Sequence, residues 1–302
     1  TANVISASKV VPDGNFKTSA ASGVWDINEA LDLIKGGNWP NAANIDPASF
    51  VDGVFSTHLY TGNGTAGRNI ENGIDLTKGG LVWIKGRETG PGGGSQGTTN
   101  DIYDTVRGVS EWLTSKETYA STAQGSGNGI TAFNSNGFTI GSSYNGTENS
   151  NGEDTVSWTF RKQPKFFDVV AYSGTQDGDK TISHSLNTTV GMAIIKRYDT
   201  NGYDWHVYHR STGVNKYLLL NTTSAAATGS IVTGTSNTTI TLSQSNGFNT
   251  SGASYLVYLF AHNNDDGGFG EPEDQDIIKC GTYAGNGNDA RTIDLGFEAQ
   301  WV

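Results

Sequence analysis

The chain has 302 residues, a formal net charge of −11 and only 16% charged residues. An excess of negative charge repels phosphate backbones and anionic lipid headgroups, so we expect no nucleic-acid partner. We also expect no insertion into a membrane, because no apolar run approaches the roughly 18 residues of a spanning helix. The chain has 41 glycines, only 6 prolines and abundant Ser and Thr, a composition typical of many short strands joined by tight polar turns.

Residues 1–52 contain one pattern that predicts a helix. Asp26 and Glu29 have the spacing of a capping box, and the apolar residues that follow recur at i, i+3, i+4 and i+7. We therefore predict a helix over about residues 26–35, with one apolar stripe, in an N-terminal anchoring segment. The stripe docks either on the first β unit or on another chain. In the second case the contact residues are Trp25, Ile27, Leu31, Ile34 and Trp39.

The rest of the chain repeats one pattern. Tyr60-Thr61-Gly62 returns as Tyr172-Ser173-Gly174 after 112 residues, and as Tyr283-Ala284-Gly285 after another 111. Further matches pair Val156-Ser157-Trp158-Thr159-Phe160 with Leu256-Val257-Tyr258-Leu259-Phe260, and Ser135-Asn136-Gly137-Phe138 with Ser245-Asn246-Gly247-Phe248. Matches in one order at a nearly constant offset indicate two full units and the start of a third.

The first unit contains about seven short apolar stretches separated by turn residues, and the second contains six. This spacing predicts an all-β fold of tandem antiparallel β-sandwiches with one short N-terminal helix. We place the first repeat at residues 53–166, the second at 167–263, an acidic Gly-rich linker at 264–275 and the start of a third, incomplete repeat at 276–302. Two strands and a beginning cannot complete a sheet, so we expect the natural chain to continue beyond Val302.

The sequence shows no catalytic constellation, and we expect neither an enzyme nor a cofactor. His206 and His209 are three residues apart in a predicted strand, so their rings point to opposite faces and cannot share a metal. Asp177-Gly178-Asp179 and Asp265-Asp266 offer carboxylates to calcium, but neither stretch has a full ligand set, and turns are the better interpretation. Cys280, the single cysteine, is expected to be a buried apolar residue of a strand.

Aromatic residues in the predicted strands have two interpretations. Strand aromatics are usually part of a core, but their faces can also stack on sugar rings. Trp205 and Tyr208 are the two that we single out for glycan contact. Loops that differ between the repeats, such as Gly90–Thr99, are the other place where we expect a ligand.

Several motifs resemble those of a known group of proteins. They include Leu59-Tyr60-Thr61-Gly62-Asn63-Gly64, Gly80-Leu81-Val82-Trp83-Ile84-Lys85 and Tyr103-Asp104-Thr105-Val106-Arg107-Gly108. Over residues 53–302 the chain resembles repeat-bearing virion proteins of tailed phages of marine and aquatic bacteria. The resemblance implies lectin-like jelly-roll sandwiches in tail fibres or adhesins, and it brings no catalytic residues.

The resemblance and the residues together predict a structural and host-attachment protein of a phage virion. We expect a tail fibre whose N-terminal part binds other tail proteins and whose β repeats project outward, with a homotrimer as the favoured assembly and a host surface glycan as a candidate ligand. The alternatives are a carbohydrate-binding module, a capsid decoration protein and, less favoured, a polysaccharide depolymerase, which needs a cleft with two carboxylates.

Overall fold

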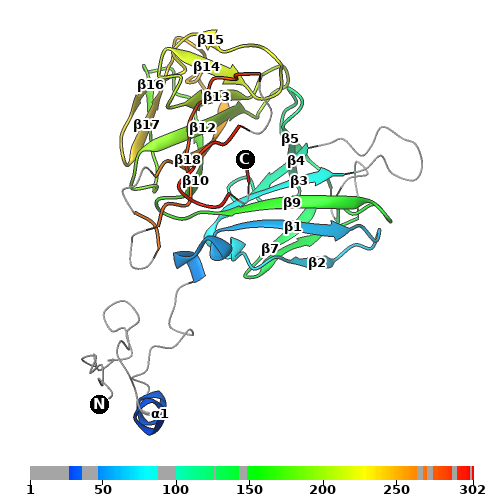
Figure 1. The fold of residues 1–302 in the computed structure, drawn as a ribbon. Coiled ribbons are helices and arrows are strands. Elements are labelled where there is room, and N and C mark those ends of the chain that lie inside the picture. The colour runs from blue at the N-terminus through cyan, green and yellow to red at the C-terminus, as the bar shows by residue number, and fades with distance from the viewer. Residues whose placement is uncertain are drawn as a thin grey trace, which may run out of the picture.

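The computed structural model describes residues 27–35, 47–87, 100–125, 127–142, 148–263, 268–270, 275–287, 291–299 and 301–302. The fold is all-β apart from one short helix and three 3-10 turns among these residues (Figure 1), as the sequence predicts. Helix α1 (Ile27–Lys35) lies within the predicted range, and the 3-10 turns are η2 (Pro47–Ser49), η3 (Val51–Gly53) and η4 (Leu76–Lys78).

The described strands form two consecutive sets of nine. The first comprises β1 (Phe55–Thr61), β2 (Arg68–Glu71), β3 (Gly80–Gly86), β4 (Asn100–Asp104), β5 (Glu111–Thr114), β6 (Thr122–Ala123), β7 (Ile130–Asn134), β8 (Gly137–Ile140) and β9 (Asp154–Arg161). The second comprises β10 (Phe167–Ser173), β11 (Lys180–Ser183), β12 (Val190–Arg197), β13 (His206–His209), β14 (Lys216–Leu219), β15 (Ala227–Thr228), β16 (Val232–Thr235), β17 (Thr239–Leu242) and β18 (Ser254–Ala261).

The two sets have the same topology. Each builds a six-stranded sheet, in the orders β1-β9-β3-β4-β5-β6 and β10-β18-β12-β13-β14-β15. Each also builds a three-stranded sheet, in the orders β2-β8-β7 and β11-β17-β16. Every strand of the second set therefore takes the place of the strand nine numbers earlier, and all named pairings are antiparallel. Tandem antiparallel sandwiches, predicted from the repeat, are confirmed.

One of the sequence matches is out of register with this topology. Asn136-Gly137 forms the turn between β7 and β8, whereas Asn246-Gly247 lies after β17, in the connection to β18. The two stretches are alike because both glycines have positive φ, 115° and 84°, and Asn-Gly suits such turns. The match of Ser135-Asn136-Gly137-Phe138 with Ser245-Asn246-Gly247-Phe248 thus reflects turn chemistry, and the prediction that it marks equivalent positions is wrong.

Three hydrophobic clusters stabilise the fold. One lies inside each sandwich, between its six-stranded and its three-stranded sheet. The third, which we call the shared core, joins the outer faces of the two six-stranded sheets. From the first set of strands it contains Phe55, Leu81, Ile102, Leu113 and Phe160, and from the second Phe167, Val169, Ile194, Val207, Leu256, Tyr258 and Phe260.

The shared core explains why some strands are apolar at consecutive positions. Strand β18 is buried along almost its whole length. Its alternate residues Leu256, Tyr258 and Phe260 belong to the shared core, and Tyr255, Val257 and Leu259 point into the second sandwich. A strand with both faces covered needs apolar residues at every position, whereas a half-exposed strand needs them only at every second one.

The C-terminal segment, from residue 275 onward, contains no strand among its described residues. It runs along the second sandwich and ends beside the first (Figure 1), where the ring of Trp301 lies 5.7 Å from that of Phe160. Cys280 is half-buried and lies outside any strand, so its predicted place in a strand is wrong. Phe269, within the predicted linker, is buried in the shared core, so this part of the linker is fixed to the body.

A close approach of loops explains the repeated Tyr-x-Gly pattern. The amides of Gly62 and Gly174 donate to Glu153 O at 2.8 Å and Ala253 O at 2.9 Å. A Cβ on Gly62 would lie 2.1 Å from Ser150 O, and one on Gly174 would lie 2.0 Å from Thr250 O. Only glycine fits there. Gly285, the third copy, has open space around its Cβ position.

We predict that Gly174→Ala destabilises the protein by about 1–3 kcal/mol, because a backbone atom must move to make room for the methyl group. Urea denaturation followed by circular dichroism measures the change. Gly285→Ala is the matched control and should stay within about 0.5 kcal/mol of wild type. Equal stability of the two variants would contradict the close approach.

Candidate functional site

The junction between the two sandwiches is the best candidate for a functional site, and it is built around a turn after β4. Asp104 ends this strand, and its Oδ1 accepts hydrogen bonds from the amides of Val106 at 3.1 Å and Arg107 at 2.9 Å. These bonds reverse the chain. The strand therefore ends at Asp104, because the carboxylate replaces the strand partners of these amides.

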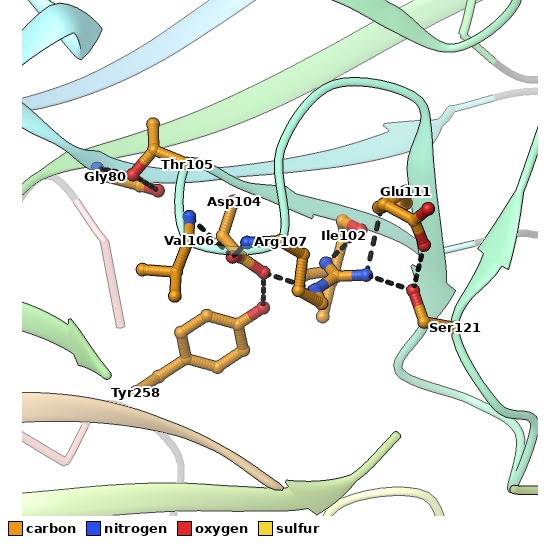
Figure 2. A network of polar contacts seen from close by, with 9 residues as sticks. All are labelled: Gly80, Ile102, Asp104, Thr105, Val106, Arg107, Glu111, Ser121 and Tyr258. Atoms are coloured by element: carbon orange, nitrogen blue, oxygen red, sulfur yellow. Dashed lines mark hydrogen bonds and ion pairs between the residues drawn. The ribbon is translucent and has the colours of Figure 1, made fainter. Parts of the chain in front are cut away.

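Arg107 points back into the protein from this turn and is almost fully satisfied (Figure 2). Its Nε donates to Asp104 Oδ2 at 2.6 Å, and its Nη2 donates to Ile102 O at 3.0 Å. Its Nη1 donates to Glu111 O and to Ser121 Oγ, both at 2.9 Å. Burial alone would lower the pKa of Arg107, but the adjacent Asp104 raises it, so the guanidinium stays charged.

Tyr258 brings the second sandwich into this network. It lies on β18, and its hydroxyl donates to Asp104 Oδ2 at 2.8 Å (Figure 2). Both side chains are buried. Burial, with the nearby Asp104, raises the pKa of Tyr258 well above its ordinary value, so the hydroxyl keeps its proton and remains a donor. We call Asp104, Arg107 and Tyr258 the junction clamp.

A second group of contacts lies beside the junction clamp. The indole Nε1 of Trp205 donates to Thr114 O at 3.0 Å and to Glu117 O at 3.2 Å. Main-chain bonds also join a loop of the first sandwich, residues 117–121, to a loop of the second, residues 198–203. Gly202 N donates to Thr118 O at 2.9 Å, and Ser121 N donates to Tyr198 O at 2.8 Å. We call this pair of loops the junction loops.

A buried lysine holds the loop of the second sandwich, residues 198–203, from the protein interior. Lys196 Nζ donates to the carbonyl of Tyr203 and lies 5.7 Å from the centre of the Trp205 ring. Its side chain is fully buried. Burial lowers the pKa of Lys196 to about 8, although Asp204 acts in the opposite direction.

The junction loops also carry exposed aromatic side chains. Tyr119 is 48% exposed and Tyr203 is 39% exposed. The Arg197 guanidinium lies 4.4 Å from the centre of the Tyr203 ring, and its Nη1 donates to the Tyr203 hydroxyl at 2.8 Å. The junction therefore presents two tyrosines on main chain that is held by hydrogen bonds across the two sandwiches.

The C-terminal segment covers a cavity of about 550 Å³ at another part of the junction. Its walls are mainly apolar and include Phe55, Phe160, Phe166 and Phe260 from the body and Phe297 and Trp301 from the segment. The thiol of Cys280 also lines it, and burial raises the pKa of that thiol to about 11, so it stays protonated near neutral pH. We interpret the cavity as a gap in the apolar packing between the C-terminal segment and the body.

The predicted anchoring residues are only partly described. Trp25 and Trp39 lie outside the described residues. Ile27 and Ile34 lie in α1, but their side chains do not belong to the described part. Leu31 is 43% exposed, and Figure 1 shows α1 apart from the sandwiches. The described part of the stripe is therefore not packed into the first sandwich.

The two residues predicted to contact a glycan lie in the protein interior, where a glycan cannot reach them. Trp205 is fully buried and Tyr208 is nearly so. Trp205 belongs to the shared core and Tyr208 to the core of the second sandwich. Neither ring offers a face to a sugar, and the prediction of glycan contact at these two residues is wrong. An alternating strand pattern cannot reveal that a second domain covers the outer face.

The predicted calcium and loop sites add no functional group. Asp177 accepts from Asn249 Nδ2 at 3.1 Å, and Asp179 accepts from Gln244 N at 3.0 Å and Thr233 Oγ1 at 2.9 Å, so both serve turns. Asp265-Asp266 and the whole of Gly90–Thr99 lie outside the described residues. Within the described ranges, no group of three or more His, Cys, Asp or Glu side chains could hold a metal. No helix there is long and apolar enough to cross a membrane.

Sequence reasoning missed the junction clamp and the two exposed tyrosines. Tyr119 and Tyr203 lie in loops outside the matched motifs, and Asn201-Gly202 before Tyr203 is a turn signal. Aromatic residues beside turns, rather than within strands, were the signal available in the sequence.

Fold and junction together define a tandem β-sandwich protein whose two repeats share one core. A family model described as Domain of unknown function (DUF7483) matches residues 50–302, and the chain belongs to this family. The match includes both sandwiches and the C-terminal segment. No curated protein matches the chain, and no solved structure matches it either.

We predict that Tyr258→Phe destabilises the protein by about 1.5–3 kcal/mol, because a buried carboxylate loses a hydrogen bond. Chemical denaturation measures the change. The control is Tyr198→Phe, since the Tyr198 hydroxyl has no hydrogen-bond partner among the described residues, and this variant should change stability by less than about 0.5 kcal/mol. A loss no larger for Tyr258→Phe than for Tyr198→Phe would show that the junction clamp contributes nothing.

Burial of Lys196 makes the free energy of unfolding depend on pH in the alkaline range. Because its folded pKa of about 8 lies below the ordinary 10.5, the unfolded chain binds more protons between these values, and stability rises with pH there. Lys196→Met removes this term. The free energy of unfolding of wild type minus that of the variant should be constant below pH 8 and then rise by at most about 1.4 kcal/mol per pH unit. A flat difference from pH 7 to pH 10 contradicts the assigned burial.

Proposed function

We propose that the chain is a structural and host-attachment protein of a tailed-phage virion, in which the sandwiches form a rigid projecting body. The shared core and the junction clamp are the observation that supports this proposal most. Two repeats that share a core cannot reorient without exposing apolar surface, and a projecting attachment body must keep its orientation under load. The motif resemblance over residues 53–302 supplies the place on the particle, a tail fibre.

The N-terminal segment is the proposed anchor. Leu31 leaves apolar surface of α1 uncovered, and an amphipathic helix gains most of its stability from packing that surface on a partner. The partner is either another tail protein or the same helix in further copies of the chain, for which a trimer is the favoured state. The same geometry suits a capsid decoration protein, which differs in location only.

A carbohydrate-binding module without a virion role is the second candidate. The observation that favours it is the pair of exposed tyrosines on the junction loops. A depolymerase is less favoured, because its two carboxylates would have to face each other across a cleft, and the lining of the described cavity is mainly apolar.

We predict that immunogold labelling of particles of the phage that encodes the chain places it on the tail. In solution, sedimentation of the whole chain should give a trimer. Leu31→Glu should dissociate the trimer, because a charge enters the helix contact. The control is Leu59→Glu, at an exposed leucine of β1 that should leave the assembly intact.

Labelling of the capsid would favour the decoration protein, and a virion without label would refute a place on the particle. A trimer unchanged by Leu31→Glu would refute the anchoring role of α1.

A further inference from the structure

We propose that the junction loops form a carbohydrate-binding surface, with Tyr119 and Tyr203 as its aromatic platforms and a neutral saccharide as its ligand. The inference deepens the proposed function and rests on it for its biological role, because it names where and through what chemistry host attachment would occur.

The two rings leave the main chain at adjacent places. Thr118 and Ala120, the neighbours of Tyr119, are both bonded to the other loop. Gly202 N donates to Thr118 O at 2.9 Å, and Ala120 N donates to Asn201 Oδ1 at 2.7 Å. Tyr203 is the next residue after Gly202. Two exposed tyrosines therefore lie on neighbouring loops of different sandwiches, which hydrogen bonds join at the residues next to them.

The main chain that carries the rings is fixed before any ligand arrives. The indole of Trp205 donates to the carbonyls of Thr114 and Glu117, next to the loop of Tyr119. Lys196 donates to the carbonyl of Tyr203. The Arg197 guanidinium pins the Tyr203 ring, with the 4.4 Å stacking contact and the hydrogen bond to its hydroxyl. A ligand that stacks on such rings loses little energy to ordering the protein, which is how aromatic anchors give affinity.

The polar groups beside the rings suit the hydroxyls of a sugar. Asn201 is exposed, and its Nδ2 has no hydrogen-bond partner among the described residues, so it offers a free donor. The Tyr119 hydroxyl is likewise without a partner in the described chain. Aromatic faces bind the C–H faces of a sugar ring, and amides and hydroxyls hold its rim.

The charges select against an anionic polysaccharide. Arg197 is the cation that stacks on the Tyr203 ring, and it is already paired with Asp199, Nε to Oδ1 at 2.8 Å. A uronic acid or sulfated sugar would meet that carboxylate and a chain with a net charge of −11. A neutral saccharide avoids both costs, so we assign the ligand to this class.

Saturation-transfer NMR on the whole chain tests the proposal. The probes are maltose, cellobiose, galactobiose and N,N′-diacetylchitobiose, with digalacturonic acid as the anionic comparison. At least one neutral disaccharide should bind with a Kd on the order of 1 mM, and Tyr119→Ala combined with Tyr203→Ala should weaken it at least about tenfold.

Control variants distinguish the loss of an aromatic ring at the site from unfolding of the loops. Tyr283→Ala removes a tyrosine that is 67% exposed but lies on the C-terminal segment, and it should bind like wild type. Tyr119→Trp should keep binding because it keeps an aromatic face. Unchanged thermal melting of the alanine variants shows that the loops remain folded.

The outcomes separate this site from the proposed function. No binding of any neutral probe, preferred binding of digalacturonic acid, or equal binding by the double alanine variant would each overturn the site. Tail labelling combined with any of these results would leave the virion role intact and move attachment elsewhere. Tyrosine-dependent binding without label on particles would keep the site and refute the virion role.

Discussion

The shared core between the two six-stranded sheets is the interaction on which the rest of the molecule depends. A sandwich normally leaves one face of each sheet to water. Here both six-stranded sheets are covered twice, inside by their own three-stranded sheets and outside by each other. The rings of Phe160, Phe167 and Phe260 meet there, with centroids 5.1 to 5.6 Å apart. Separating the repeats would expose these rings together, so the repeats act as one body.

Apolar burial brings the sheets together but does not fix the angle between them, because it has no direction. The junction clamp supplies direction. Asp104 is buried, and a buried carboxylate is tolerated only when its oxygens are bonded. Three of its donors, the amides of Val106 and Arg107 and the Nε of Arg107, belong to its own turn. The fourth is the hydroxyl of Tyr258 from the other sandwich. Only one placement of β18 satisfies this carboxylate, so a polar contact sets the register of an apolar interface.

The sequence predicted what depends on local pattern and missed what depends on the second sandwich. The repeat was visible because Gly62 and Gly174 are required by close loops, and α1 was visible from its periodicity. The junction clamp was not, since its Tyr258 lies 154 residues from Asp104 in the chain. The burial of Trp205 could not be predicted either. Alternation along a strand assigns side chains to the two faces of a sheet, but it does not reveal whether another domain covers the outer face.

The proposed binding surface lies where the two repeats meet. Each sandwich alone would present one tyrosine on one loop, without the hydrogen bonds that the loop of the other repeat supplies. Joining the repeats brings the loops that carry Tyr119 and Tyr203 together, and the bonds from Gly202 and Ala120 fix both loops. The matched family region covers both repeats rather than one. A surface made by the junction is a property that only the pair has, so the pair is the smallest unit in which such a site can exist.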